Sequence, residues 1–273
     1  MPVAQINGID LHYREAGEGF PVVLVHGFTG NSRNWALTVP VVRERFRTVS
    51  VDLPGHGLSE KPTASDAYTG ERMSDDVHGL IRYLGIEECY LVGHSMGGMV
   101  AQHLVLSYPT LVRALVLVDT AAELSSVLQE RASDRERLVQ TVRTRGMEAV
   151  FDEQLRLNPQ RKELEANPGF LKTWREQFLM TSPDAYIYCA HGMANRRALL
   201  RELPCVSAPT LIVCGENDDP FIEASRQMHD AISGSELLLI AGAGHSPQIE
   251  APSRFNEALM GFLVRVHEVA GVA

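Results

Sequence analysis

The chain contains several continuous runs of apolar residues that are too short to form buried helices. The first spans residues 21–26 (PVVLVH). Runs of this kind are typical of strands in a parallel sheet, because helices cover both faces of such a sheet. Similar runs recur at residues 46–51, 89–92, 111–118, 210–214 and 236–240. The pattern therefore predicts a sheet whose strands are buried on both sides.

Stretches of helical composition separate these runs, at residues 32–43, 70–84, 96–107, 222–232 and 252–269. A strand followed by a helix and a further strand forms a crossover unit, in which the two strands are parallel. The chain opens differently, because Asn7-Gly8 separates two short alternating segments, 3–6 and 9–13, and favours a β-hairpin. The sequence thus predicts an α/β fold with a mostly parallel central sheet flanked by helices.

Residues 121–203 interrupt the alternation of strands and helices. This stretch is helical in composition and is divided by Pro and Gly at 158–159, 167–169 and 182–183. A structureless loop of that length is improbable in a compact domain. We therefore predict a helical insertion at 121–203, within a core domain formed by residues 1–120 and 204–273.

One serine lies where a predicted strand turns into a predicted helix. Residues 93–97 (GHSMG) place Ser95 at the apex of this turn, with glycines two positions before and after it. A sharp strand-to-helix turn lifts a serine hydroxyl clear of its own backbone, and glycines leave room for the close approach that the turn requires. The segment is therefore interpreted as a nucleophile elbow with Ser95 as the nucleophile.

An activated serine needs a base and an acid that orients the base. His245 follows the last predicted strand in a small-residue loop, 241–247, which we expect to be flexible, and is the predicted base. Asp218 follows the strand at 210–214 and is the predicted acid. Asp119, at the end of the strand at 111–118, is the alternative acid, because strand ends often carry functional carboxylates in α/β sheets.

Acyl transfer also needs two N–H donors for the oxyanion of the tetrahedral intermediate. One is expected from the residue after the nucleophile, Met96, and the other from the loop after the strand at 21–26, at Phe28. Because backbone groups donate these bonds, the side chains at both positions are free to line a substrate pocket.

Composition narrows the choice of partners. The 273 residues carry a formal net charge of −9, which argues against nucleic acid and anionic membranes as partners. The four cysteines are scattered singly and suggest neither a metal site nor a cofactor. The N-terminal segment lacks a signal-peptide pattern, and no apolar run reaches the roughly 18 residues of a membrane span. We expect a cytoplasmic protein with a small-molecule substrate, whose oligomeric state the sequence leaves open.

These motifs together resemble the α/β-hydrolase fold superfamily. The resemblance rests on residues 26–28 (HGF), 52–59 (DLPGHGLS), 93–98 (GHSMGG), 215–218 (GEND) and 244–245 (GH). It implies that the insertion is a cap domain over the active site. Haloalkane dehalogenases and epoxide hydrolases carry an aspartate at the elbow, and the serine here makes their alkyl-enzyme route unlikely for this chain. Residues 95–100 and 119–122 look like those of 3-oxoadipate enol-lactonases and related small-ester hydrolases.

The cap is expected to select the substrate. Aromatic and methionine side chains would form an apolar pocket, or would simply pack within the cap and core. They are Phe28, Trp35, Trp174, Phe178, Met180, Tyr186, Tyr188 and Met193. Arg196, Arg197 and Arg201 would hold a substrate carboxylate, or form a solvated helix face.

The sequence therefore predicts a serine carboxylesterase that acts through an acyl-enzyme. The alternatives are an enol-lactone or C–C bond hydrolase with a carboxylated substrate, a cofactor-free perhydrolase, and a ligand-binding receptor that keeps the hydrolase fold. A complete set of three triad residues disfavours the receptor, because binding alone does not need them.

Overall fold

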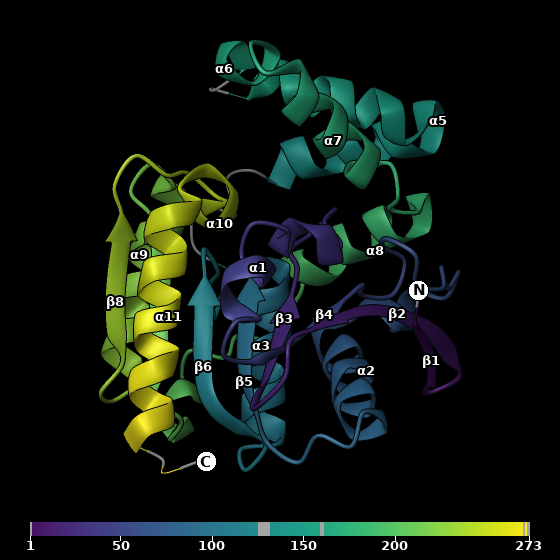
Figure 1. Cartoon of the computed structure of the whole chain (residues 1–273). Coiled ribbons are helices and arrows are strands. Elements are labelled where there is room, and N and C mark those ends of the chain that lie inside the picture. Colours follow the sequence, from purple (N-terminus) through teal and green to yellow (C-terminus); the bar gives the residue numbers. More distant parts are fainter. Residues whose placement is uncertain (1, 125–131, 159–160, 270, 272–273) are drawn as a thin grey trace.

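A computed structural model describes residues 2–124, 132–158, 161–269 and 271, and its centre is one eight-stranded sheet (Figure 1). The spatial order of the strands is β1-β2-β4-β3-β5-β6-β7-β8. The pairs β1–β2 and β2–β4 are antiparallel and all the others are parallel. The α/β fold with a mostly parallel sheet is thus confirmed. The strands are β1 (Val3–Ile6), β2 (Ile9–Ala16), β3 (Pro21–Val25), β4 (Arg47–Val51), β5 (Cys89–His94), β6 (Val112–Val118), β7 (Thr210–Gly215) and β8 (Glu236–Ile240).

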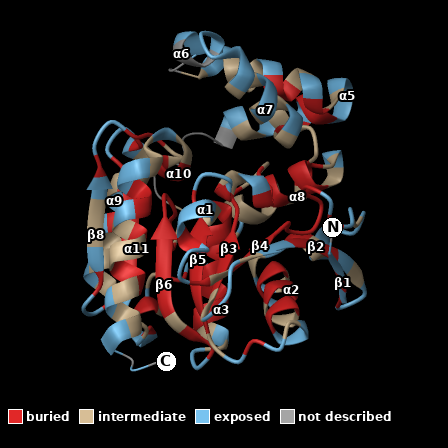
Figure 2. Cartoon of the chain, in the orientation of Figure 1, coloured by how far each residue is buried: buried red, intermediate tan, exposed pale blue. Residues whose placement is uncertain are grey.

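Helices cover both faces of the sheet, as the continuous apolar runs require. Along β3, Val23 and Val25 join the core beneath α2 (Gly70–Tyr83), α3 (Met96–Ser107) and α9 (Asp219–Ala231). The alternate residues Val22 and Leu24 join the core beneath α1 (Val39–Val42) and α11 (Pro252–Val269). Successive side chains of a strand point to opposite faces, so each run fills two cores. Figure 2 shows the central strands buried and the edge strands β1 and β8 more exposed.

The predicted helix at 32–43 is wrong. The structure has a short 3₁₀ helix, Ser32–Trp35, and then the four-residue α1. Pro40 has no N–H to donate to the carbonyl of Ala36, so a continuous helix cannot pass through this position. The other predicted helices are present, although α9 begins three residues earlier than expected, at Asp219, with Pro220 in its first turn.

The stretch predicted as an insertion contains α5 (Ala132–Leu157), α6 (Arg161–Glu165), α7 (Pro168–Phe178) and α8 (Pro183–Ala194). Residues 125–131 and 159–160 of this stretch lie outside the described residues. Figure 1 shows α5, α6 and α7 beyond the carboxyl ends of the parallel strands. Apolar side chains of α5, α7 and α8 form a cluster distinct from the two sheet cores. Among the helices that the structure describes, none is long and apolar enough to cross a membrane.

Helix α8 lies beneath the other insertion helices and connects them to the core domain. Ala185 and Cys189 belong to the core on the α2/α3 face of the sheet, whereas Tyr186 and Ile187 belong to the apolar cluster of the insertion. The backbone of Ser182, just before α8, donates a 2.9 Å hydrogen bond to the carbonyl of Gly55. Helix α8 therefore packs both against the sheet core and against the apolar cluster of α5 and α7.

Candidate active site

Ser95 occupies a strained position between β5 and α3. Its φ of 52° and ψ of −116° lie where non-glycine residues are rare, at a cost of about 1–3 kcal/mol. Two bonds hold this conformation. The Ser95 N–H donates to the carbonyl of Val118 at 2.8 Å, and the Thr120 hydroxyl donates to the carbonyl of Ser95 at 2.7 Å. The neighbouring strand β6 and the residues at its end thus fix the turn that carries Ser95.

The glycines around Ser95 permit contacts that a side chain would block. A β-carbon on Gly93 would lie 2.4 Å from the carbonyl oxygen of Gly97, and one on Gly97 would lie 2.4 Å from that of Val25. Both obstacles are backbone atoms, which cannot move aside as a side-chain end can. The two flanking glycines of the elbow are therefore required by close packing of β5, α3 and β3.

The structure brings the predicted nucleophile, base and acid into one hydrogen-bonded chain. His245 Nε2 lies 2.9 Å from Ser95 Oγ, and His245 Nδ1 lies 2.7 Å from Asp218 Oδ2. Ser95 follows β5, Asp218 follows β7 and His245 follows β8, so the sheet places all three at its carboxyl edge. Since the Asp218 carboxylate accepts from Nδ1–H, Nε2 is left to accept the serine proton.

Asp218 also adjusts the basicity of His245. Burial disfavours the charged imidazolium and acts to lower the pKa of His245, but the hydrogen bond and negative charge of Asp218, together with the smaller effects of Asp119 and Glu250, outweigh it. The pKa of His245 is therefore raised above its ordinary value. A base of this kind accepts a proton from a serine hydroxyl more readily than an isolated imidazole does.

Asp119, the alternative acid, contacts Asp218 rather than the histidine. It is fully buried, and its Oδ1 accepts the N–H of Gly215 at 2.9 Å, while its Oδ2 has no hydrogen-bond partner among the described residues. Burial raises the pKa of Asp119 well above its ordinary value, and the neighbouring Asp218 carboxyl contributes. Burial thus favours the uncharged form of Asp119, and the carboxylate bonded to the imidazole of His245 is that of Asp218.

The two predicted oxyanion donors lie in backbone segments next to the serine. Met96 is the first residue of α3, whose N–H has no intrahelical acceptor. On the other side, a β-carbon on Gly27 would lie 3.0 Å from the β-carbon of Ser95, so the loop that carries Phe28 passes close to the nucleophile. Thr29 has a φ of 59°. Ser95 and Asp119 also have positive φ, of 52° and 43°. Backbone strain of this kind often clusters at functional sites.

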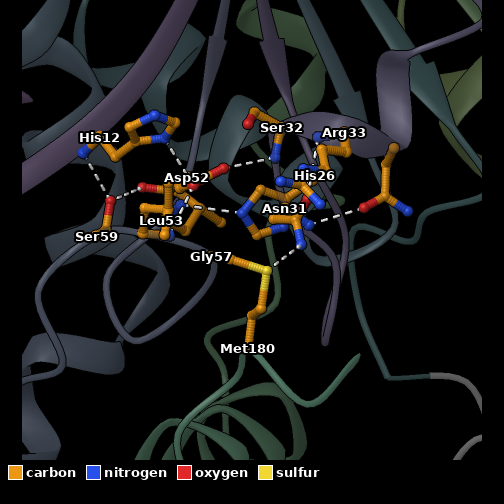
Figure 3. Close-up of polar contacts among 12 residues, drawn as sticks. His12, His26, Asn31, Ser32, Arg33, Asp52, Leu53, Gly57, Ser59 and Met180 are labelled. Atoms are coloured by element: carbon orange, nitrogen blue, oxygen red, sulfur yellow. Dashed lines mark hydrogen bonds and ion pairs between the residues drawn. The ribbon is translucent and has the colours of Figure 1, made fainter. Parts of the chain in front are cut away.

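A buried polar network supports the loop that carries Phe28 (Figure 3). Asp52 accepts the N–H of Ser32 at 2.6 Å and pairs with His12 Nδ1 at 2.8 Å. His26 Nε2 accepts the N–H of Leu53 at 2.9 Å, and its Nδ1–H donates to the carbonyl of Gly27 at 2.7 Å. Burial lowers the pKa of His26, which keeps it in this neutral form. These side chains are structural, and they fix the loop on both sides.

The structure separates the predicted pocket residues into different environments. Trp35 is fully buried in the core beneath α11, where its ring lies 6.3 Å from that of Phe255, so it does not line the site. Phe178 is also fully buried, and it packs with Trp174 in the apolar cluster of the insertion. Tyr186 is the residue that reaches the loop, with its ring 4.8 Å from that of Phe28.

Further contacts connect the insertion to the site region. Met193 packs against the core on the α2/α3 face, and Met180 Sδ accepts a 3.9 Å hydrogen bond from Asn31 (Figure 3). Asn31 also begins the 3₁₀ helix that follows the Phe28 loop. Asn31 and Thr120 were not predicted as site residues, because a capping side chain and a hydroxyl beyond a strand carry no distinctive sequence signal.

The three candidate arginines differ in their contacts. Arg197 pairs with Glu202 at 2.6 Å, and Arg201 is exposed. Arg196 is half-buried and donates to the carbonyls of Met193 at 2.6 Å and Glu123 at 2.7 Å, and its Nε has no partner among the described residues. Of the three, only Arg196 is thus partly withdrawn from solvent without an acidic partner among its described bonds.

The family model for the alpha/beta hydrolase fold matches residues 21–252, and the chain belongs to this family of hydrolases. An esterase from Thermogutta terrifontis is 31% identical, with a TM-score of 0.87 over 98% of this chain and 100% of that one. An enol-lactonase from Burkholderia xenovorans is 29% identical, also with a TM-score of 0.87, over 96% and 100%. A soluble epoxide hydrolase from a Corynebacterium species is 38% identical over 117 residues, which span only 40% of that protein and 42% of this chain.

Proposed function

We propose that this protein hydrolyses carboxylic esters through an acyl-enzyme formed on Ser95. The hydrogen-bonded chain from Ser95 through His245 to Asp218 is the observation that carries the proposal. Such a chain is the arrangement that serine-dependent acyl transfer needs. The likeness to an esterase over nearly the whole length of both chains adds support.

The proposed reaction proceeds in two halves. His245 Nε2 takes the proton of the Ser95 hydroxyl while Oγ attacks the ester carbonyl, and the N–H groups of Phe28 and Met96 hold the oxyanion that forms. The imidazolium then gives its proton to the departing alcohol, which leaves the acyl group on Ser95. Water, activated by the same imidazole, attacks the acyl-enzyme and releases the acid.

The pH dependence of ester hydrolysis follows from the state of His245. The imidazole must be neutral to accept the serine proton, and its pKa is raised above the ordinary value of about 6.5. We therefore expect kcat/KM to fall as the pH drops through that raised pKa, with the midpoint of the limb above about 6.5. A profile of kcat/KM with a neutral p-nitrophenyl ester checks this, and a midpoint below the ordinary value would contradict it.

A second candidate is the hydrolysis of enol-lactones or other esters that carry a carboxylate. The bonding of Arg196 favours it, since a half-buried guanidinium with an unpartnered Nε is suited to a carboxylate. Two similar proteins point the same way, because one is an enol-lactonase and the esterase was solved with malate bound. Under this candidate, Arg196 selects the substrate and Ser95 performs the same chemistry.

A paired substrate assay separates the two candidates. If Arg196 binds a substrate carboxylate, Arg196→Gln raises KM for a carboxylated ester by about tenfold or more and leaves KM for its neutral methyl ester unchanged. Arg201→Gln, at an exposed position, is the matched control and changes neither value. Equal effects of Arg196→Gln on both substrates would show that the arginine is structural.

A further inference from the structure

The loop that carries His245 is held by polar bonds on both sides of the catalytic residue. One oxygen of Glu250, Oε2, accepts the N–H of Gly244 at 2.6 Å, and the other, Oε1, accepts the N–H of Ser246 at 2.9 Å. His94 Nε2–H donates to the carbonyl of His245 at 2.7 Å. Two peptide units next to His245, 243–244 and 245–246, are thus held by side chains, so the loop at 241–247, expected to be flexible, is tied down on both sides of the base.

The short helix after His245 places the Glu250 carboxylate within reach of the N–H groups of both Gly244 and Ser246. Helix α10 (Pro247–Glu250) turns the chain back directly after His245, so that Glu250 faces the loop it has just left. Gly244 permits the approach, since a β-carbon there would lie 3.0 Å from Glu250 Oε2. Bonds from N–H groups to a carboxylate are stronger than bonds between neutral groups. Each carboxylate oxygen therefore has a defined backbone donor.

The charge of Glu250 also acts on the imidazole of His245. The titratable side chains around that ring are Asp218, which is bonded to it, Asp119, Glu250 and His94. Burial lowers the pKa of His94 to about 3, so His94 is neutral and adds no positive charge. The negative charge of Asp218 acts most strongly on the ring, followed by Asp119 and then by the Glu250 carboxylate. The negative charge of Glu250 favours the imidazolium that forms when His245 takes a proton.

We propose that Glu250 is a positioning residue for the base, fixing the backbone on both sides of His245 and stabilising its imidazolium by charge. This proposal rests on the proposed function of His245 as the base. It assigns a role to a carboxylate that touches neither the serine nor the acid.

The substitution Glu250→Gln tests both parts of the proposal. An amide offers one acceptor oxygen instead of two and carries no charge, so one of the two N–H groups loses its bond. We expect kcat for a p-nitrophenyl ester to fall by about 10- to 100-fold with KM unchanged. The His245 ring titration, followed by NMR, moves to lower pH, and amide hydrogen exchange at Gly244 and Ser246 accelerates.

Two further variants complete the experiment. Glu257→Gln removes one charge from an exposed position on α11 and is expected to match the parent in kcat, titration and exchange. Glu250→Asp keeps the charge but shortens the side chain, so it accelerates exchange while largely keeping the His245 titration. This variant also serves if Glu250→Gln does not fold.

The outcomes distinguish this proposal from the proposed function. Exchange and ring titration need no substrate, so they report on Glu250 even if the parent protein does not hydrolyse esters. Parent-like exchange and titration in Glu250→Gln would overturn the proposal. A protein without ester turnover in which both readouts shift as expected would refute the proposed function and leave the structural role of Glu250 supported.

Discussion

Replacing Ser95 by alanine is expected to lower kcat for p-nitrophenyl ester hydrolysis by about 10⁴-fold or more. The substitution removes the oxygen that would attack the carbonyl and carry the acyl group, while the strained turn keeps its bonds to Val118 and Thr120, which involve backbone atoms of residue 95. Initial rates at saturating ester concentration measure the effect. The fold should persist, with an unchanged circular dichroism spectrum.

Ser107→Ala is the matched control for this result. Ser107 is the last residue of the same helix, α3, and is exposed. We expect this variant to hydrolyse esters at the parent rate. Full activity in Ser95→Ala would show that another group attacks the ester, and equal losses in both variants would point to an effect on α3 rather than on the nucleophile.

Replacing Asp218 by asparagine is expected to reduce kcat by about 10⁴-fold, the loss seen when the orienting acid of a serine triad becomes an amide. The amide nitrogen can donate to His245 Nδ1, which favours the tautomer that carries its proton on Nε2 and cannot accept one from Ser95. The imidazolium also loses the negative charge that the 2.7 Å contact provides. Single-turnover kinetics measure the loss in the chemical step itself.

The variant Asp119→Asn tests which of the two carboxyl groups, Asp218 or Asp119, orients His245. Asp119 is buried, which raises its pKa and favours the uncharged form, and an amide of nearly the same shape still accepts the N–H of Gly215 through its oxygen. We therefore expect Asp119→Asn to keep kcat within about tenfold of the parent. A loss as large as that of Asp218→Asn would show that the wrong carboxyl has been assigned as the acid.

Much of the fold was predictable because strands buried on both faces appear in the sequence as short continuous apolar runs. The run PVVLV fills both cores by alternation, so it identifies β3 without knowledge of its neighbours. The glycines at 93 and 97 mark the elbow because backbone atoms crowd them in the fold. The helix predicted at 32–43 was wrong, because that prediction took no account of Pro40, which cannot continue the hydrogen-bonding pattern of a helix.

The pocket was less predictable, because residue type does not say which way a side chain points. Trp35 and Tyr186 are both aromatic and almost fully buried, yet one packs beneath α11 and the other lies over Phe28. The prediction that the loop at 241–247 is flexible missed a different kind of contact. Its small residues suggest mobility, whereas a glutamate five positions beyond His245 holds the backbone. Such contacts depend on the turn at α10, which the loop's own residues do not reveal.

Labelling with a fluorophosphonate, followed by peptide mass spectrometry, tests the central claim most directly. The probe forms a covalent bond with a serine oxygen only where a base activates the hydroxyl and donors stabilise the developing oxyanion. We predict one adduct per chain, on Ser95, lost in Ser95→Ala and strongly slowed in Asp218→Asn. An unlabelled protein, or an adduct on any residue other than Ser95, would contradict the assignment of Ser95 as an activated nucleophile.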